Sequence, residues 1–136
     1  MNDPQRVFLD TSVLVRYFAD DDPPRALAAA RLVESDTRLL VSSGALVELI
    51  HTLRSDYGIG NPVLAEGLIT FLSRPNVELT DAHLDGVVAA LRWSTRVSAR
   101  RIPDAIISAA AERAGCDWIA TFDERFTSPS VPVRAI

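Results

Sequence analysis

Short runs dominated by apolar residues divide the chain at intervals. Such runs lie at 7–9, 39–41, 77–79 and 117–121, and each has the length and composition of a buried strand. A further run at 131–133 contains proline, which sheets tolerate at their edges. The pattern therefore predicts four strands and a short fifth strand at an edge.

The segments between these runs are helical in pattern. Helices are expected over 11–19, 25–34, 43–55, 61–73 and 102–114, and a further long helix contains the apolar positions 84, 87, 88 and 91. Strands that alternate with helices predict an α/β fold with a mostly parallel sheet of four to five strands and helices on both faces. We expect residues 1–136 to form a single domain.

Polar residues mark where several of these helices begin. Thr11 or Ser12 is expected to lie near the cap of the first helix, and Ser42 or Ser43 to cap the helix over 43–55. The long helix is expected to begin at a cap formed by one of two residues, Thr80 or Asp81. Gly115 is expected to end the last helix, because glycine is common just past a helix C-terminus.

Composition excludes several classes of protein. The longest apolar runs are far shorter than the roughly 20 residues that cross a bilayer, so no membrane segment is expected. The stretch from Met1 to Arg6 is polar and does not resemble a secretory signal. The only cysteine, Cys116, excludes an internal disulfide and a cysteine-based zinc cluster. A reducing, cytoplasmic location is the simplest expectation.

All 14 basic residues are arginine. The absence of lysine excludes phosphate binding by a P-loop, and it argues against aspartyl phosphatases and phospho-acceptor domains, which need a lysine. Such a phosphatase also carries a second acid two residues after its first aspartate, and this chain has Ser12 there. The segment after the first strand holds no glycine, which argues against a dinucleotide-binding module.

Four carboxylates lie beside the predicted strands. Asp10 directly follows the first strand, and Asp123 follows the fourth by two residues. Glu48 lies in the early turns of the helix after the second strand. Asp104 opens a helix that leads into the fourth strand and must run antiparallel to it. Because the carboxyl ends of parallel strands share one edge of a sheet, we expect all four side chains to face one crevice.

Each acid also has a simpler explanation. Asp104 after Pro103 suits a helix N-terminus through the helix dipole, and Asp123 suits a turn. Glu48 points away from the apolar stripe of its helix, as a solvated residue does. Asp10, an acid that ends an apolar strand, is the hardest to explain without a function. The joint pattern outweighs the separate explanations.

Converging anions repel one another unless a cation neutralises them or their pKa values rise. Carboxylate oxygens are ligands that Mg²⁺ and Mn²⁺ prefer. Neutralising the four acids would raise the formal net charge from -4 to 0, so the acidity of the chain is concentrated in a site. The sequence predicts a divalent metal site, with one or two ions, and metal-assisted hydrolysis of a phosphodiester.

The same segments resemble the motifs of the PIN-domain family, especially the small VapC-type ribonuclease toxins of bacterial toxin–antitoxin pairs. The four motifs are, in chain order, Phe8-Leu9-Asp10-Thr11-Ser12-Val13-Leu14-Val15, Ala45-Leu46-Val47-Glu48-Leu49, Pro103-Asp104-Ala105-Ile106-Ile107 and Ile119-Ala120-Thr121-Phe122-Asp123. Their spacing and the length of the chain fit the family, so the resemblance covers nearly the whole chain.

The resemblance implies a PIN-like α/β/α sandwich and an endoribonuclease that uses Mg²⁺ or Mn²⁺. By motif position, the catalytic and metal-binding acids are Asp10, Glu48, Asp104 and Asp123. Ser12 and Thr121 occupy hydroxyl positions beside two of these acids, where they would orient a carboxylate or a water, and capping is the alternative role. The resemblance also implies an RNA substrate, an antitoxin that blocks the site, and a homodimer.

An RNA backbone needs positive charge beside the metal. Arg92, Arg96 and Arg100 recur every four residues, and Arg101 follows. On a helix these residues would form one stripe leading toward Asp104, and we predict that it contacts RNA phosphates. The alternative is an ordinary solvated helix face.

Two other functions stay open on the sequence. One is an RNA-processing or repair nuclease outside a toxin system, and the other is a non-catalytic PIN-like RNA-binding protein. The loss of one motif acid would favour the second, and all four are present. Expression toxicity that a small co-encoded partner relieves would distinguish a toxin from a processing nuclease.

Overall fold

The computed structural model describes residues 3–19 and 21–136. Its elements, in chain order, are β1 (Arg6–Phe8), α1 (Thr11–Phe18), α2 (Pro23–Val33), β2 (Arg38–Val41), α3 (Ser43–Ser55), α4 (Asn61–Leu72), β3 (Val77–Leu79), α5 (Leu84–Thr95), α6 (Ile102–Arg113), β4 (Ile119–Thr121) and β5 (Val133–Ala135). Among these described residues, no helix combines the length and the apolar character needed to span a bilayer.

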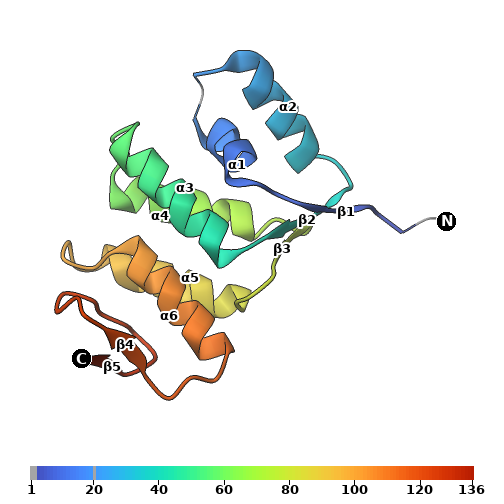
Figure 1. Ribbon diagram of the computed structural model, residues 1–136. Coiled ribbons are helices and arrows are strands. Elements are labelled where there is room, and N and C mark those ends of the chain that lie inside the picture. The colour runs from blue at the N-terminus through green and yellow to red at the C-terminus, as the bar shows by residue number, and fades with distance from the viewer. Residues whose placement is uncertain (1–2, 20) are drawn as a thin grey trace.

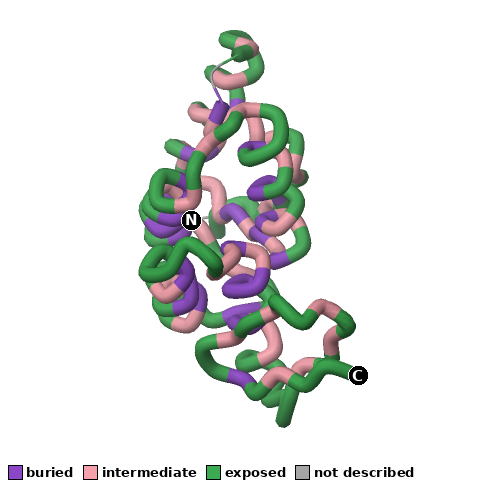
Figure 2. The backbone as a smooth tube through the Cα atoms, turned by 90° about the vertical axis from the view of Figure 1, so that its left-hand side faces the viewer, coloured by how far each residue is buried: buried purple, intermediate pink, exposed green. Residues whose placement is uncertain are grey.

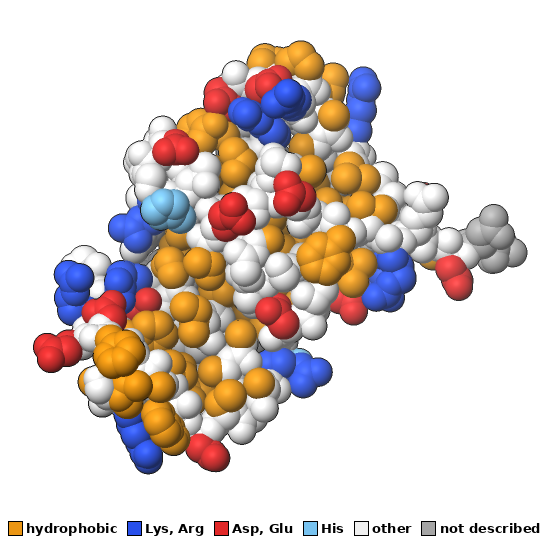
Figure 3. All heavy atoms as spheres, viewed as in Figure 1, with side chains coloured by type: hydrophobic (Ala, Val, Ile, Leu, Met, Phe, Trp, Pro, Cys, Tyr) orange, Lys and Arg blue, Asp and Glu red, His pale blue; other side chains and the backbone are white. Residues whose placement is uncertain are grey.

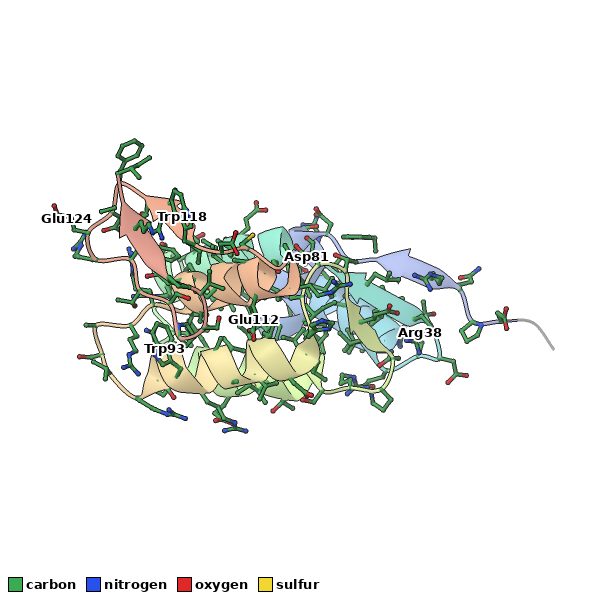
Figure 4. All side chains as sticks on the ribbon, turned by 90° about the horizontal axis from the view of Figure 1, so that it is seen from below. Arg38, Asp81, Trp93, Glu112, Trp118 and Glu124 are labelled. Carbon is green, nitrogen blue, oxygen red and sulfur yellow. The ribbon has the colours of Figure 1, made fainter. Side chains whose placement is uncertain are left out.

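All five strands pair in parallel, which confirms the α/β class. They are divided, however, between a three-stranded sheet in the order β1-β2-β3 and a two-stranded sheet of β4 and β5. Figures 1 and 4 show α5 and α6 lying between these two sheets. The strands are only three or four residues long, so their composition indicates that they are strands but not which neighbour each one takes.

The first sheet fixes a common edge for the residues that follow its strands. Phe8 of β1 lies opposite Leu40 of β2, so the two strands end together. Asp10 and Ser42 therefore follow at the same edge, as parallel pairing requires. Helices α1 and α3 begin at this edge.

The helices pack as a chain of neighbours around one core. α1 contacts α2 and α3, α3 contacts α6, and α6 contacts α5, which in turn contacts α4. The predicted stripe of Leu46, Ile50 and Leu53 on α3 is at most 1% exposed, so it lies at the centre of this core. Figure 2 shows buried residues concentrated in the middle of the molecule and mainly exposed ones near the C-terminus.

Only some of the predicted helix caps occur in the structure. The hydroxyl of Ser42 accepts from the backbone N–H of Ala45 and caps α3, and Gly115 follows α6 with a φ of 72°, so both of these predictions are confirmed. The N-cap of α1 is Asp10 and Thr11 follows it as the first helical residue, so the prediction that Thr11 or Ser12 lies near this cap is confirmed. The N-cap of α5 is His83, and the carboxylate of Asp81 instead accepts from the N–H of Ser43 at the start of α3.

Candidate active site

Asp10 is fixed by the first turn of α1. As the N-cap it accepts hydrogen bonds on Oδ2 from both the backbone N–H and the hydroxyl of Ser12. These bonds hold the pKa of Asp10 below its ordinary value, the side-chain bond from Ser12 contributing most. The carboxylate is thus exposed, ionised and oriented at the edge where β1 ends.

Glu48 contacts the residue that follows Asp10, although it is 38 residues further along the chain than Asp10. It projects from α3, and its Oε2 accepts a hydrogen bond of 3.0 Å from the hydroxyl of Thr11, the residue after Asp10. Glu48 is solvent-exposed, as its position off the apolar stripe predicts, but it is not a free surface residue. Thr11 therefore holds Glu48 at the start of α1, where Asp10 is the N-cap.

Asp104 and Asp123 form a pair around one guanidinium group. Nη2 of Arg101 lies 3.2 Å from Oδ2 of Asp104 and 2.6 Å from Oδ2 of Asp123, and Nε lies 3.3 Å from the same Asp104 oxygen. Asp104 is only 4% exposed and also accepts from the N–H of Thr127 at 3.4 Å. A single cation thus bridges two carboxylates that are 19 residues apart in the chain.

Asp123 is held by its own turn as well. Its N–H donates to the hydroxyl of Thr121 at 3.0 Å, and its Oδ1 accepts from the N–H of Arg125 at 2.9 Å. The pKa of Asp123 lies below its ordinary value, first because of the hydrogen bond from Arg101 and then because of the one from Arg125. The hydrogen bond between Arg101 and Asp123 also raises the pKa of Arg101.

A groove beside Glu48 extends to Pro103 at the start of α6. It has a volume of about 630 Å³ and lies between α3 and α6, with Glu48 on one wall and Pro103, which precedes Asp104, on the other. Figure 3 shows acidic side chains spaced along one face of the molecule among hydrophobic ones, rather than gathered at one point. Within 3–19 and 21–136, no three acidic, histidine or cysteine side chains are close enough to hold one metal ion.

Comparison with protein families identifies the chain. The model of the PIN domain matches residues 7–131, a segment that contains all four acids. The chain belongs to the PIN domain family. A comparison with curated proteins finds no match. Among solved structures, the chain is similar to the toxin VapC20 of Mycobacterium tuberculosis, described as cleaving the sarcin–ricin loop, with 21% identity, a TM-score of 0.43, and coverage of 88% of this chain and 91% of that one.

The arginine residues of this PIN domain do not form the predicted continuous stripe. Helix α5 ends at Thr95, where the hydroxyls of Ser94 and Thr95 bond to backbone carbonyls three residues earlier and compete with further helical turns. Arg96 and Arg100 therefore lie at or beyond the end of the helix, and the expectation of one helical face was wrong.

The arginines of this segment have separate surroundings. Arg92 pairs with Glu66 of α4 at 3.6 Å, and the guanidinium of Arg100 lies 4.7 Å from the ring centroid of Trp93. Figure 4 shows Trp93 at the same end of the molecule as Glu124. Of the four predicted arginines, only Arg101 is hydrogen-bonded to two of the motif acids.

The groove also contains basic residues that the sequence did not single out for function. His51 and Arg54 project from α3 into the groove that Glu48 borders. A signal was present, because His51 follows Glu48 by three residues and Arg54 follows His51 by three, and residues at this spacing are neighbours on a helix surface.

The carboxylates of Asp104 and Asp123 are suitable ligands for a divalent cation. Asp104 and Asp123 already hold a positive charge between them, since the guanidinium of Arg101 contacts both carboxylates. Carboxylate oxygens are the ligands of Mg²⁺ and Mn²⁺. Asp10 and Glu48 offer the same oxygen ligands, although within the described residues they form no metal-binding cluster with Asp104 and Asp123.

The ion pair of Arg101 and Asp123 predicts a pH-dependent stability difference. Because the pKa of Asp123 is lowered by Arg101, this contribution is full above the unfolded pKa of about 3.8 and is lost as the pH falls through the folded value. We expect Arg101→Gln to be less stable than the wild type at pH 6 and the two proteins to converge toward pH 2. Urea unfolding midpoints at several pH values measure this. A difference that stays constant with pH would show that Arg101 contributes by packing alone.

Proposed function

We propose that this PIN domain is a metal-dependent endoribonuclease, a hydrolase that cuts RNA phosphodiesters with Mg²⁺ or Mn²⁺. The observation that supports this most is the pair formed by Asp104 and Asp123 around one positive charge. Membership of the PIN domain family and the groove that connects Asp104's helix to Glu48 give further support.

In this proposal each acid has a role that follows from its surroundings. Asp104 and Asp123 hold the cation, because they are the two acids that already share a positive charge. Asp10 contributes an ionised oxygen from the edge of the first sheet, and Glu48 holds the cation directly or through water. When bound, the divalent ion lowers the pKa of a coordinated water and offsets negative charge on the phosphate.

Ser12 and Thr121 keep two of these acids in place. Ser12 donates to Oδ2 of Asp10, so this carboxylate has a fixed orientation before any ligand arrives. Thr121 accepts from the backbone N–H of Asp123 and so fixes the turn that carries that acid. Both are positioning residues in the proposal, because they act through a carboxylate.

We further propose that the protein is the toxin of a toxin–antitoxin pair in the cytoplasm, acting as a single-domain homodimer that a cognate antitoxin inhibits. The motif resemblance supports this role. The alternatives are an RNA-processing nuclease and a non-catalytic RNA-binding protein. Growth arrest on expression, relieved by a small protein encoded beside the gene, supports the toxin. RNA cleavage without growth arrest would favour processing.

The enzymatic proposal is tested by removing the metal. Purified protein is incubated with a structured RNA in Mg²⁺ or Mn²⁺, in EDTA, and in EDTA followed by excess Mn²⁺. We expect internal cleavage with the metals, none in EDTA, and recovery on adding Mn²⁺. Cleavage that persists in EDTA would contradict metal dependence, and RNA binding without cleavage under every condition would support the non-catalytic alternative.

The predicted RNA contacts of Arg96 and Arg100 give a separate expectation. If both contact phosphates, the double substitution Arg96→Gln with Arg100→Gln should weaken RNA binding and reduce the slope of log affinity against log salt by about 1.4, since each single-strand contact contributes about 0.7. Fluorescence anisotropy at several salt concentrations measures the slope. Arg31→Gln with Arg113→Gln is the control for net charge, and an equal reduction there would contradict a local contact.

A further inference from the structure

Arg101 occupies the position between two carboxylates where the proposed function places a metal ion. Its Nη2 contacts Oδ2 of both Asp104 and Asp123, and no other described arginine pairs with two acids of the PIN motifs. Arg125, the other arginine paired with Asp123, lies 3.8 Å from the opposite oxygen, Oδ1, and its side chain is 88% exposed. The two arginines therefore differ in geometry although both neutralise Asp123.

We propose that Arg101 is a built-in competitor of the divalent cation: it holds Asp104 and Asp123 together in the metal-free protein and must release them before the metal binds. This inference rests on the proposed function and deepens it, because it assigns a regulatory role to a residue of the same site. It differs from the phosphate-contacting role that the sequence predicted for Arg101.

The competition follows from shared atoms. A guanidinium and a metal ion cannot both occupy the space between the two Oδ2 atoms, which lie within 2.6 to 3.3 Å of the Arg101 nitrogens. Charge-assisted hydrogen bonds of this kind are among the stronger ones in proteins. A metal ion can therefore bind the two carboxylates only after it displaces their hydrogen bonds with Arg101. The free energy of breaking these bonds lowers the apparent affinity of the protein for the metal.

The local structure allows Arg101 to leave without unfolding the helix. Its backbone carbonyl accepts from the N–H of Ala105 at 3.2 Å as the N-cap of α6, and no side-chain capping bond is involved. The Arg101 side chain is 37% exposed, so a path to solvent is open. Displacement thus requires only rotation of one side chain, and the released guanidinium stays beside the site, where an RNA phosphate would be its next partner.

The experiment compares Mn²⁺ binding by calorimetry in the wild type and in matched variants at one pH and one salt concentration. We expect Arg101→Gln to bind Mn²⁺ about tenfold more tightly, which corresponds to about 1.4 kcal/mol. Arg125→Gln also removes one positive charge beside Asp123, but it leaves Arg101 between the two carboxylates. The Mn²⁺ affinity of this variant should therefore change by no more than about twofold.

A second variant keeps the test decisive if Arg101→Gln does not fold. Arg101→Lys retains the charge but loses the planar fork that reaches both acids, and we expect a smaller gain of about threefold in Mn²⁺ affinity. Thermal unfolding supplies an independent reading: Arg101→Gln should melt at a lower temperature than the wild type without metal and show the larger stabilisation by Mn²⁺.

Each outcome bears on the inference. Unchanged or weaker Mn²⁺ binding in the folded Arg101 variants would overturn it, as would an equal gain in Arg125→Gln. Unchanged affinity together with metal-dependent RNA cleavage overturns the inference and leaves the proposed function standing. A gain in affinity without cleavage by any variant supports the inference and contradicts the proposed function. Absence of Mn²⁺ binding in every protein overturns both.

Discussion

Asp10→Asn is expected to abolish metal-dependent RNA cleavage while leaving the protein folded. The substitution removes a negative charge from the proposed metal site, and we expect the cleavage rate to fall by at least about 10³-fold, or about 4 kcal/mol in the activation barrier. Asparagine is as good an N-cap as aspartate and still accepts from Ser12, so the stability of α1 should change by less than about 1 kcal/mol.

Cleavage of a labelled RNA in Mn²⁺ and urea unfolding together measure this prediction. Asp36→Asn is the control, because it removes one negative charge from an exposed position outside the four motifs. Its cleavage rate should stay within about twofold of the wild type. Undiminished cleavage by Asp10→Asn, in a preparation free of contaminating nuclease, would remove Asp10 from the proposed chemistry.

Asp104→Ala is expected to lose both stability and metal binding. The carboxylate is almost fully buried, and its removal leaves the N–H of Thr127 and part of the Arg101 guanidinium without their acceptor. We expect a loss of about 2 kcal/mol in the free energy of unfolding, less than for a fully buried pair because the Arg101 side chain reaches solvent. Urea unfolding and Mn²⁺ calorimetry measure the two effects.

Asp104→Asn separates the two roles of this residue. It keeps the size of the side chain and an oxygen acceptor for the N–H of Thr127, so it should be more stable than Asp104→Ala. It still lacks the charge, so its Mn²⁺ affinity should be reduced by at least about tenfold. Metal affinity equal to that of the wild type in Asp104→Asn would show that this acid serves the fold alone.

Much of the helical structure is predictable from the sequence because its determinants are local. The spacing of Leu46, Ile50 and Leu53 predicted the buried face of α3, and Ser42 predicted its start. Gly115 predicted the end of α6, because its φ of 72° suits a residue without a Cβ. In each case one to three neighbouring residues contain the whole signal.

Other features depend on contacts that the sequence does not display. Asp81 looked like a helix cap, but parallel pairing of β2 and β3 brings it to Ser43, so it stabilises the start of α3 instead. The end of α5 at Thr95 depends on which hydroxyls bond back to the helix. Strand pairing is the largest such feature, because nothing in a three-residue strand such as β4 states that its partner is β5.

In the candidate site, too, local features were predictable from the sequence and tertiary contacts were not. The positions of Asp10 and Asp104 at element boundaries were predictable, since strand ends and helix starts are local features. Their grouping was predicted only in part: the structure joins Asp104 and Asp123 through Arg101 and holds Glu48 against Thr11, the neighbour of Asp10. Within the described residues the four acids do not form one metal-binding cluster. The bridging role of Arg101 requires knowing that the turn after β4 packs against the start of α6.

The central claim, that these carboxylates bind a divalent metal, is tested most directly by anomalous X-ray diffraction from a crystal soaked in Mn²⁺. We expect an anomalous peak within about 2.5 Å of oxygens of both Asp104 and Asp123, with the Arg101 guanidinium displaced from between them. A peak elsewhere, or none at a Mn²⁺ concentration that supports RNA cleavage, would contradict it.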